Sequence, residues 1–212
     1  MMAESGGRLR RLGPRAPRQH LTLAGSAAGA VALAVLVAGG FDPLEKPEAD
    51  VAPLAAGEAV DLGPFTVTVD RMRVVDELPG ISEGDDDTRV LALVATVTAT
   101  GTTTQYGAML SESVALEQLP GVAGDGDGPV PADDVYVMAD GTRLDAVQPG
   151  LEYEVALVWE QDARADVPSD ARLVLVGRTL RESSIDRSME WLDPLPVVAG
   201  VLEVTAPAEE ES

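Results

Sequence analysis

The residue types that most often carry out catalysis are scarce in this chain. Its 212 residues include one histidine, His20, one lysine, Lys46, and no cysteine. A Ser-His-Asp triad needs a histidine and a Schiff base needs a lysine, yet both residues lie outside the segments whose pattern indicates a folded core. The lack of cysteine excludes disulfides, thiolate catalysis and cysteine-ligated zinc. We therefore expect a protein that is not an enzyme and that uses no cofactor.

Carboxylates are the one abundant reactive group, and several occur in short runs next to glycine. Clustered oxygen ligands suit calcium, so these runs are the nearest approach to a metal site. The spacing matches no calcium motif, because Pro129 stands where a further ligand is needed and no glutamate closes an EF-hand loop. The commoner use of such runs is to keep an exported domain soluble. The candidate calcium ligands are Asp85, Asp86, Asp87, Asp125 and Asp127.

The charge balance limits both partners and chemistry. The chain has 36 acidic and 15 basic residues, a net charge of −21, whereas a nucleic-acid-binding surface needs a basic patch. A glycosidase uses paired carboxylates, but it also needs aromatic platforms for the sugar rings, and aromatic residues make up 3% of this chain. We expect neither a nucleic-acid partner nor a glycosidase site.

The N-terminus has the pattern of a membrane segment. Residues 1–20 form a basic tail with five arginines and one glutamate, and no further Asp, Glu, Lys or Arg follows before Asp42. The uncharged run over residues 21–41 can cross the hydrocarbon core, which takes about 20 helical residues. A cleaved secretory signal is the alternative, although its apolar region is shorter, about 7–15 residues. We predict a retained transmembrane helix, or uncleaved signal anchor, that contacts the lipid bilayer through residues 21–41.

The arginines orient this span by the positive-inside rule. The tail is then cytoplasmic, and the chain after Phe41, with 35 acidic and 10 basic residues, lies outside the cell. Three prolines give residues 42–57 the composition of an extended stalk. Residues 58–206 are the expected extracytoplasmic domain, and residues 207–212 a disordered acidic tail.

Within residues 58–206, apolar and polar residues alternate in several segments, which is the pattern of β-strands. In the clearest strand, residues 151–159, five large apolar side chains from Leu151 to Trp159 share one face. Residues 89–100 and 171–176 are apolar on both faces, as central strands are. The alternation changes parity near Asp70-Arg71, which predicts a β-bulge.

Turn signals separate these strands. Asp140-Gly141 predicts a two-residue type I′ hairpin between residues 136–139 and 142–144. Pro149-Gly150 predicts the next reversal of the chain. Weaker strands are predicted over residues 58–62, 113–117 and 201–205.

Helical spacing occurs once, over residues 183–192. Ile185, Met189 and Leu192 would share one face of a helix, with Trp191 beside them. We predict a short helix packed on the edge of the strands. The alternative is an exposed docking surface that carries the tryptophan.

About eight short strands with loops rich in Gly, Pro and Asp indicate two packed antiparallel sheets. The expected fold class is therefore all-β, an antiparallel β-sandwich of about 7–9 strands that follows one N-terminal transmembrane helix.

Several segments carry a resemblance to a known family. They are Phe65-Thr-Val-Thr-Val69, Val97-Thr-Ala-Thr-Gly101 at the end of the stretch from Arg89, Asp140-Gly141, Pro149-Gly150 and Leu157-Val-Trp-Glu160. Together they resemble the bacterial immunoglobulin-like domains of unknown function that follow one membrane segment or a lipobox in Gram-positive surface proteins. The resemblance covers roughly residues 58–180 and implies an immunoglobulin-like β-sandwich, an extracytoplasmic location and no catalytic residue. The chain differs from the lipobox members because it has no cysteine, and its Ala- and Arg-rich composition is typical of an actinobacterium.

The expected function is that of a non-catalytic, single-pass cell-membrane protein with a cytoplasmic N-terminus and an extracellular domain. That domain would act as an accessory, protein-interaction module that binds another membrane or envelope protein in an envelope or transport assembly. The alternatives are an extracytoplasmic receptor for a ligand or calcium, and a structural spacer at the cell surface. A receptor needs a concave pocket with convergent polar groups, whereas a docking module needs an exposed apolar patch or an open sheet edge.

Overall fold

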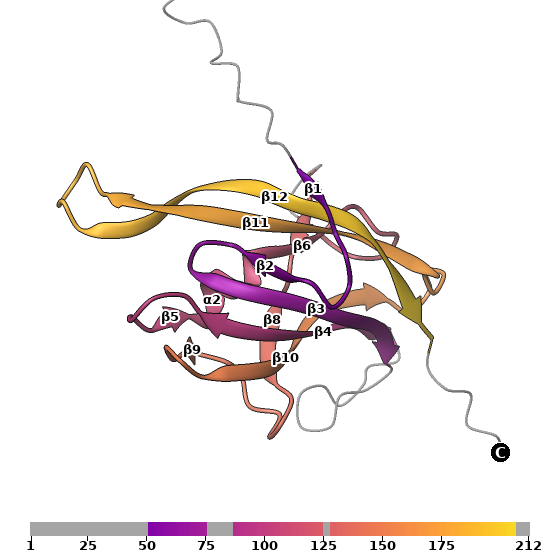
Figure 1. Cartoon of the computed structure of the whole chain (residues 1–212). Helices are drawn as coiled ribbons and strands as arrows, with labels where there is room; N and C mark the ends of the chain where they lie inside the picture. The colour runs from indigo at the N-terminus through magenta and orange to yellow at the C-terminus, as the bar shows by residue number, and fades with distance from the viewer. Residues whose placement is uncertain (1–50, 76–86, 125–127, 207–212) are drawn as a thin grey trace, which may run out of the picture. The chain divides into compact units, whose positions relative to one another are not determined.

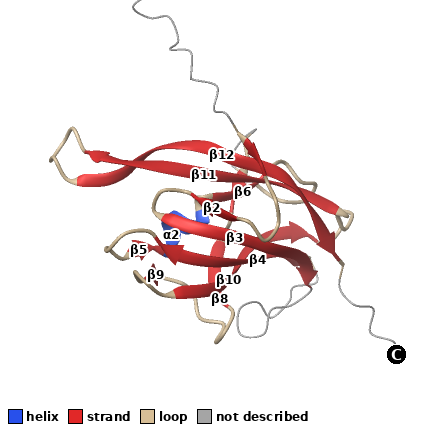
Figure 2. Cartoon of the chain, in the orientation of Figure 1, coloured by secondary structure: helices blue, strands red, loops and turns tan. Residues whose placement is uncertain are grey.

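The computed structural model describes residues 51–75, 87–124 and 128–206 (Figure 1). The chain divides into two units, Met1–Pro47 and Glu48–Ser212, and every described residue belongs to the second. Strands make up most of this second unit (Figure 2). In chain order its elements are β1 (Ala52–Pro53), β2 (Ala59–Asp61), β3 (Phe65–Val75), β4 (Thr88–Ala99), β5 (Gln105–Tyr106), α2 (Gly107–Ser111), β6 (Val114–Leu116), β7 (Val130–Pro131), β8 (Asp134–Val137), β9 (Ala146–Val147), β10 (Glu152–Asp162), β11 (Asp170–Glu182) and β12 (Met189–Thr205).

Ten of the strands form one mixed, curled sheet. Its order is β7-β6-β11-β12-β3-β4-β10-β8, with β1 beside β12 and β2 beside β3, while β5 and β9 pair separately. The half around β11 and β12 lies over the half around β3, β4 and β10, so the sheet curls into a half-barrel of two layers (Figure 2). This mostly-β architecture, which resembles a β-sandwich, confirms the fold class at that level.

The sheet is not the purely antiparallel one that the sequence predicted. Val204 and Thr205, at the end of β12, pair in parallel with Met72 and Arg73 of β3 and thereby join the two layers. β1 also pairs in parallel with β12. Both pairings connect segments far apart in the chain, so no local alternation encodes them. Of the twelve strands in the described residues, four have only two residues, and the other eight agree with the expected number.

The core lies between the two layers and confirms the clearest predicted strand. Val155, Leu157 and Trp159 of β10 are completely buried, as their shared face predicted. Leu151 lies just before β10 and is 53% exposed, so it does not belong to this face. The Trp159 indole N–H donates a hydrogen bond to the Val130 carbonyl at 3.0 Å, which joins β10 to β7 through the core.

The central strands also follow their patterns. The β3–β4 register shifts between Val69 and Arg71, which confirms the predicted bulge. Every side chain from Val90 to Ala95 of β4 is buried, and β4 lies between β3 and β10 in the sheet. Its second face forms a small apolar cluster of its own, with Ala156 and Val158 of β10.

The turn at Asp140-Gly141 reverses the chain, but it is not the predicted type I′ turn. That turn requires a positive φ at both central residues. Gly141 has a φ of 69°, but Asp140 does not have a positive φ, because the only non-glycine residues with positive φ in the described part of the chain are Arg187 and Asp193. The loop is longer, because the Val137 N–H bonds the Thr142 carbonyl at 2.8 Å. Pro149-Gly150 is a turn as predicted, with a φ of 75° at Gly150.

The helix predicted over residues 183–192 is wrong. β11 continues to Glu182 and β12 begins at Met189, so that Glu182 pairs with Met189 and Leu180 with Trp191. A hydrogen bond of 2.7 Å from the Ser183 N–H to the Ser188 carbonyl closes the loop between them. The helical spacing is coincidental, because Met189 and Trp191 point to one face of a strand with period two.

The described part of the chain contains one short helix, α2, which the sequence did not predict. No helix in the described ranges is long and apolar enough to cross a membrane. The predicted tail and transmembrane segment, residues 1–41, the stalk up to residue 50 and the acidic tail 207–212 lie outside these ranges.

Candidate interaction surface

Four of the five predicted calcium candidates, Asp85, Asp86, Asp125 and Asp127, lie outside the described residues. The fifth, Asp87, forms a salt bridge with Arg164, and its carbonyl accepts a hydrogen bond from the Ala163 N–H at 2.9 Å. Across the ranges that the structure describes, no three His, Cys, Asp or Glu side chains gather in a way that could hold a metal ion. Asp87 therefore joins two loops through its contacts with Arg164 and Ala163.

The acidic pair Asp133-Asp134, which lies in the described part, has structural contacts. Asp133 accepts a hydrogen bond from the Glu160 N–H at 2.9 Å, and Asp134 forms a salt bridge of 2.7 Å with Arg143. Burial, and then the negative charge of Asp134, raise the pKa of the nearby Tyr136 hydroxyl. The Asp133 contact fixes the start of β8 against β10, and the Asp134 contact connects β8 to the loop that follows it.

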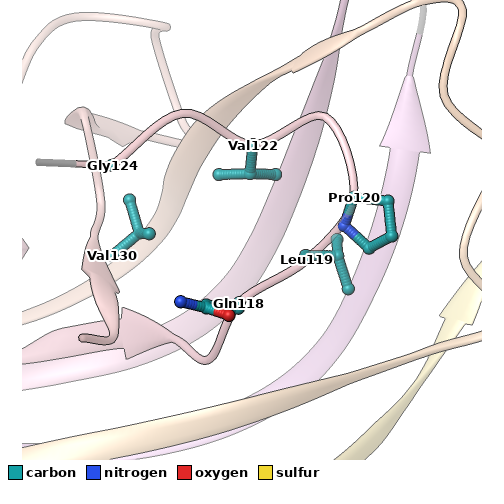
Figure 3. Close-up of a pocket in the computed structure, with 6 residues that line it drawn as sticks. All are labelled: Gln118, Leu119, Pro120, Val122, Gly124 and Val130. Carbon is teal, nitrogen blue, oxygen red and sulfur yellow. The ribbon is translucent and has the colours of Figure 1, made fainter. Parts of the chain in front are cut away.

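One pocket of about 430 Å³ opens beside β7 (Figure 3). Its volume suits a small ligand. Two carbonyls at its border already accept hydrogen bonds, that of Pro120 from the Gln161 amide at 2.6 Å and that of Val130 from Trp159. Among the described residues that line it, the pocket offers one polar side chain and no charged one, which is a poor match to a receptor site. Its lining residues are Gln118, Leu119, Pro120, Val122, Gly124 and Val130.

The most unusual surface is the far end of the β11–β12 hairpin, residues 179–195, which we call the ribbon. It projects beyond the two layers on the left of Figure 1. In the described strands, residues 179–182 pair only with residues 189–192, because β6 pairs with β11 at residues 173–175 and β1 with β12 at residues 198–199. Four of the ten exposed large apolar side chains of the described residues belong to the ribbon: Leu180, Ile185, Met189 and Leu195.

Two of these side chains, Leu180 and Met189, share one face of the ribbon with Trp191. Cross-strand partners in an antiparallel pair point to the same side, so Leu180 and its partner Trp191 share a face with Met189. Met189 is 61% exposed and Ile185, at the tip, is 94% exposed. Exposure of a large aliphatic side chain to water is unfavourable, by about 25 cal/mol per Å² of apolar surface. The ribbon therefore presents the apolar patch that a docking module needs.

The base of the ribbon is held firmly to the body. Arg178 donates from its N–H to the Leu62 carbonyl at 2.8 Å, and its nearly buried guanidinium bonds the Ser113 hydroxyl at 2.6 Å and the Glu112 carboxylate at 2.8 Å. Gly63 lies against the same point with a φ of 91°, where a Cβ would be 2.1 Å from the Arg178 carbonyl oxygen and 2.9 Å from the Trp191 ring. Only glycine fits this contact, so the ribbon leaves the body in a fixed direction.

The tip of the ribbon is also ordered by its own contacts. Asp186 accepts hydrogen bonds from the Ser188 N–H at 3.1 Å and from the Ser188 hydroxyl at 2.7 Å. A Glu190 oxygen lies 2.8 Å from the same hydroxyl, which donates to one of the two carboxylates at a time. Farther back, Asp193, in the left-handed region with a φ of 55°, pairs with Arg181 at 2.5 Å. The tip therefore combines an apolar face with fixed negative charge.

Sequence reasoning named Ile185, Met189, Leu192 and Trp191 as a possible docking surface but assigned them to a helix. It missed the contribution of Leu180, Ser188 and Gly63. Pro194 and Pro196 gave no clear signal, since prolines are tolerated in edge strands and are also common just after the end of a helix.

Neither a protein-family model nor a curated protein sequence matches this chain. Among solved structures, an uncharacterised β-sandwich protein from Clostridium difficile is similar, with a TM-score of 0.46 and 10% identity over 76% of this chain and 100% of its own. A candidate lipoprotein from Bacillus subtilis has a TM-score of 0.39 and 15% identity over 71% of this chain, which spans 39% of that protein. A candidate lipoprotein from Staphylococcus aureus has a TM-score of 0.39 and 10% identity over 71% of this chain and 99% of its own.

Proposed function

We propose that this chain is a non-catalytic, membrane-anchored accessory protein. Its extracytoplasmic β domain, a variant of the immunoglobulin-like domain, docks through the ribbon onto another membrane or envelope protein. Residues 21–41 hold it in the bilayer with the arginine-rich tail inside the cell.

The observation that carries this proposal is the exposed apolar face of the ribbon. Leu180, Met189 and Ile185 project beyond the body on a two-stranded element whose base is anchored by Arg178. A contiguous apolar face on a fixed, protruding element is typical of a surface that a partner covers. The pocket beside β7 supports a receptor function less well, because only Gln118 among its lining side chains is polar.

The sequence supports the rest of the proposal. One histidine in the basic tail and no cysteine leave few means for nucleophilic or metal-dependent catalysis. Five arginines before the uncharged run and none within it favour a cytoplasmic N-terminus.

The test is gentle detergent extraction of the tagged full-length protein from its native membranes, followed by quantitative mass spectrometry of the proteins that remain bound. We expect one stoichiometric envelope partner with the natural chain and its loss with Met189→Glu, which places a charge on the apolar face. Val201→Glu is the matched control, since Val201 lies on the same strand, outside the ribbon, and is 58% exposed against 61% for Met189.

The proposal fails if the natural chain is recovered alone. It also fails, as far as the ribbon is concerned, if Met189→Glu and Val201→Glu retain the partner equally.

A further inference from the structure

The two most exposed apolar side chains of the ribbon would be buried best in an apolar recess on the surface of a partner. Ile185 is 94% exposed at the turn and Met189 is 61% exposed at the start of β12. Burial of two such side chains is favourable only if the partner surrounds them with apolar atoms, as a pocket does and a flat polar surface does not.

The charges at this end are unevenly paired. Arg181 pairs with Asp193 at 2.5 Å, and Arg187 lies 3.9 Å from Glu182. Asp186 and Glu190, which share the Ser188 hydroxyl, form no salt bridge with a described residue. The tip therefore has two adjacent carboxylates that remain open to a cation beside its two most exposed apolar side chains.

The net charge of the domain indicates which class of partner can bind the tip of the ribbon. The chain after Phe41 has 35 acidic and 10 basic residues, so a second copy of this domain would be repelled at the tip. An anionic lipid surface would be repelled for the same reason. A protein with basic side chains around an apolar recess would be attracted and oriented by the same field.

From these three observations we infer that the ribbon binds a protein whose surface has an apolar recess for Ile185 and Met189, bordered by lysine or arginine side chains that pair with Asp186 and Glu190. This inference rests on the docking function proposed above and defines its partner. The N–H and the hydroxyl of Ser188 hold the Asp186 carboxylate before binding, so little ordering of that side chain is required when the partner arrives.

The test is photo-crosslinking of the full-length protein in its native membranes, with p-benzoylphenylalanine in place of Ile185. The crosslinked peptide is identified by mass spectrometry, and its yield is compared in two backgrounds. Asp186→Lys with Glu190→Lys reverses the charge of the tip. Glu58→Lys with Glu203→Lys is the matched control, because both residues are exposed, lie outside the ribbon and change the net charge equally.

We expect a crosslink to a peptide with lysine or arginine beside apolar residues. We expect its yield to fall at least tenfold when the tip is reversed and to stay within twofold in the control. An unchanged yield after reversal would overturn the inferred charge of the partner and leave docking intact. A crosslink to a second copy or to lipid would overturn the inferred class of partner. The lack of any crosslink from position 185 would remove the docking function itself, and this inference with it.

Discussion

At the scale of single residues, Trp159 shows how the edge strand β7 is held to the opposite layer of the curled sheet. The indole is completely buried on β10, and its N–H bonds the Val130 carbonyl of β7 at 3.0 Å. β7 is the first strand in the strand order and β10 the last but one, so this bond links elements that share no ladder. If the indole N–H is removed, the buried Val130 carbonyl has no donor, and the free-energy cost of its desolvation is no longer offset by a hydrogen bond.

We therefore expect Trp159→Phe to reduce the free energy of unfolding by about 2 kcal/mol, from the unpaired carbonyl and the lost volume. The measurement is urea unfolding of the detergent-solubilised full-length protein, followed by circular dichroism. Tyr153→Phe is the control, since its hydroxyl makes one long contact, 3.4 Å from the Gln148 nitrogen, and we expect a loss below about 0.5 kcal/mol. Equal losses in the two variants would contradict the role of the indole bond.

Ser188 lowers the pKa of one carboxylate at the ribbon tip. Its hydroxyl and then its backbone N–H lower the pKa of Asp186 below the ordinary value of 3.8. A lowered pKa in the folded state means that this carboxylate supports the tip at pH values above about 4 and that the support is lost as the pH falls through the folded pKa. The tip therefore stays negative throughout the physiological range.

We expect Ser188→Ala to raise the pKa of Asp186 toward 3.8, as measured by a carbon-13 NMR titration of the side-chain carboxyl. Asp140 provides an internal control, because the hydroxyl and N–H of Thr142 lower its pKa in the same way. That pKa should not change in Ser188→Ala and should rise in Thr142→Ala. If the pKa of Asp186 did not change when the hydroxyl was lost, Ser188 would not be the residue that lowers it.

At the scale of elements, the β11–β12 hairpin depends on Gly63 for its direction. Gly63 and Gly57 both have positive φ, 91° and 78°, but a Cβ at Gly63 would meet the Arg178 carbonyl oxygen at 2.1 Å, whereas one at Gly57 would meet nothing within 4 Å. Alanine substitutions at the two glycines therefore separate the cost of the left-handed backbone conformation, about 1 kcal/mol, from the cost of the clash with the Arg178 carbonyl.

We expect Gly57→Ala to cost about 1 kcal/mol of stability and Gly63→Ala clearly more. In Gly63→Ala alone, hydrogen exchange of residues 179–192 should become faster, because the base of the ribbon must move. Equal exchange in the two variants would mean that Gly63 does not anchor the ribbon.

The elements that the sequence predicts well are those whose burial follows alternation alone. β10 and β4 match their patterns, and the bulge in β3 follows from the parity change at Asp70-Arg71. The helix predicted over residues 183–192 is wrong because the cross-strand partners Leu180 and Trp191 lie eleven positions apart, beyond the window in which helical spacing is judged. The parallel pairing of β12 with β3 joins residues that are even farther apart in the chain, so no local sequence pattern predicts it.

The candidate surface was predictable only in part, because a local sequence pattern identifies apolar residues but not their exposure. Apolar side chains between charged ones identified Ile185, Met189 and Trp191 as residues of interest. Their exposure could not be predicted, since it depends on where the body of the domain ends. Gly63 gave no signal either, because its importance comes from Arg178, more than a hundred residues later in the chain.

At the scale of the whole molecule, the distribution of charge bears on both self-association and membrane orientation. The strongly acidic domain repels copies of itself, and the five arginines of the tail favour its display outside the cell. The ribbon is then the apolar element through which such a domain could associate with a partner. The account requires that this end of the domain be covered in the cell and open in the purified protein.

The lack of native cysteine allows a direct measurement of this requirement. Ile185→Cys and, as a control, Tyr106→Cys introduce single thiols at positions that are 94% and 71% exposed. Each variant is labelled with a membrane-impermeant maleimide, once on intact wall-stripped cells and once as purified full-length protein.

The account predicts that the thiol of Ile185→Cys reacts at least tenfold more slowly on cells than in the purified protein, while the thiol of Tyr106→Cys reacts at similar rates in both. Equal rates for Ile185→Cys in the two settings would contradict the docking function. Failure of both variants to react on cells until the membrane is opened would contradict the extracytoplasmic location.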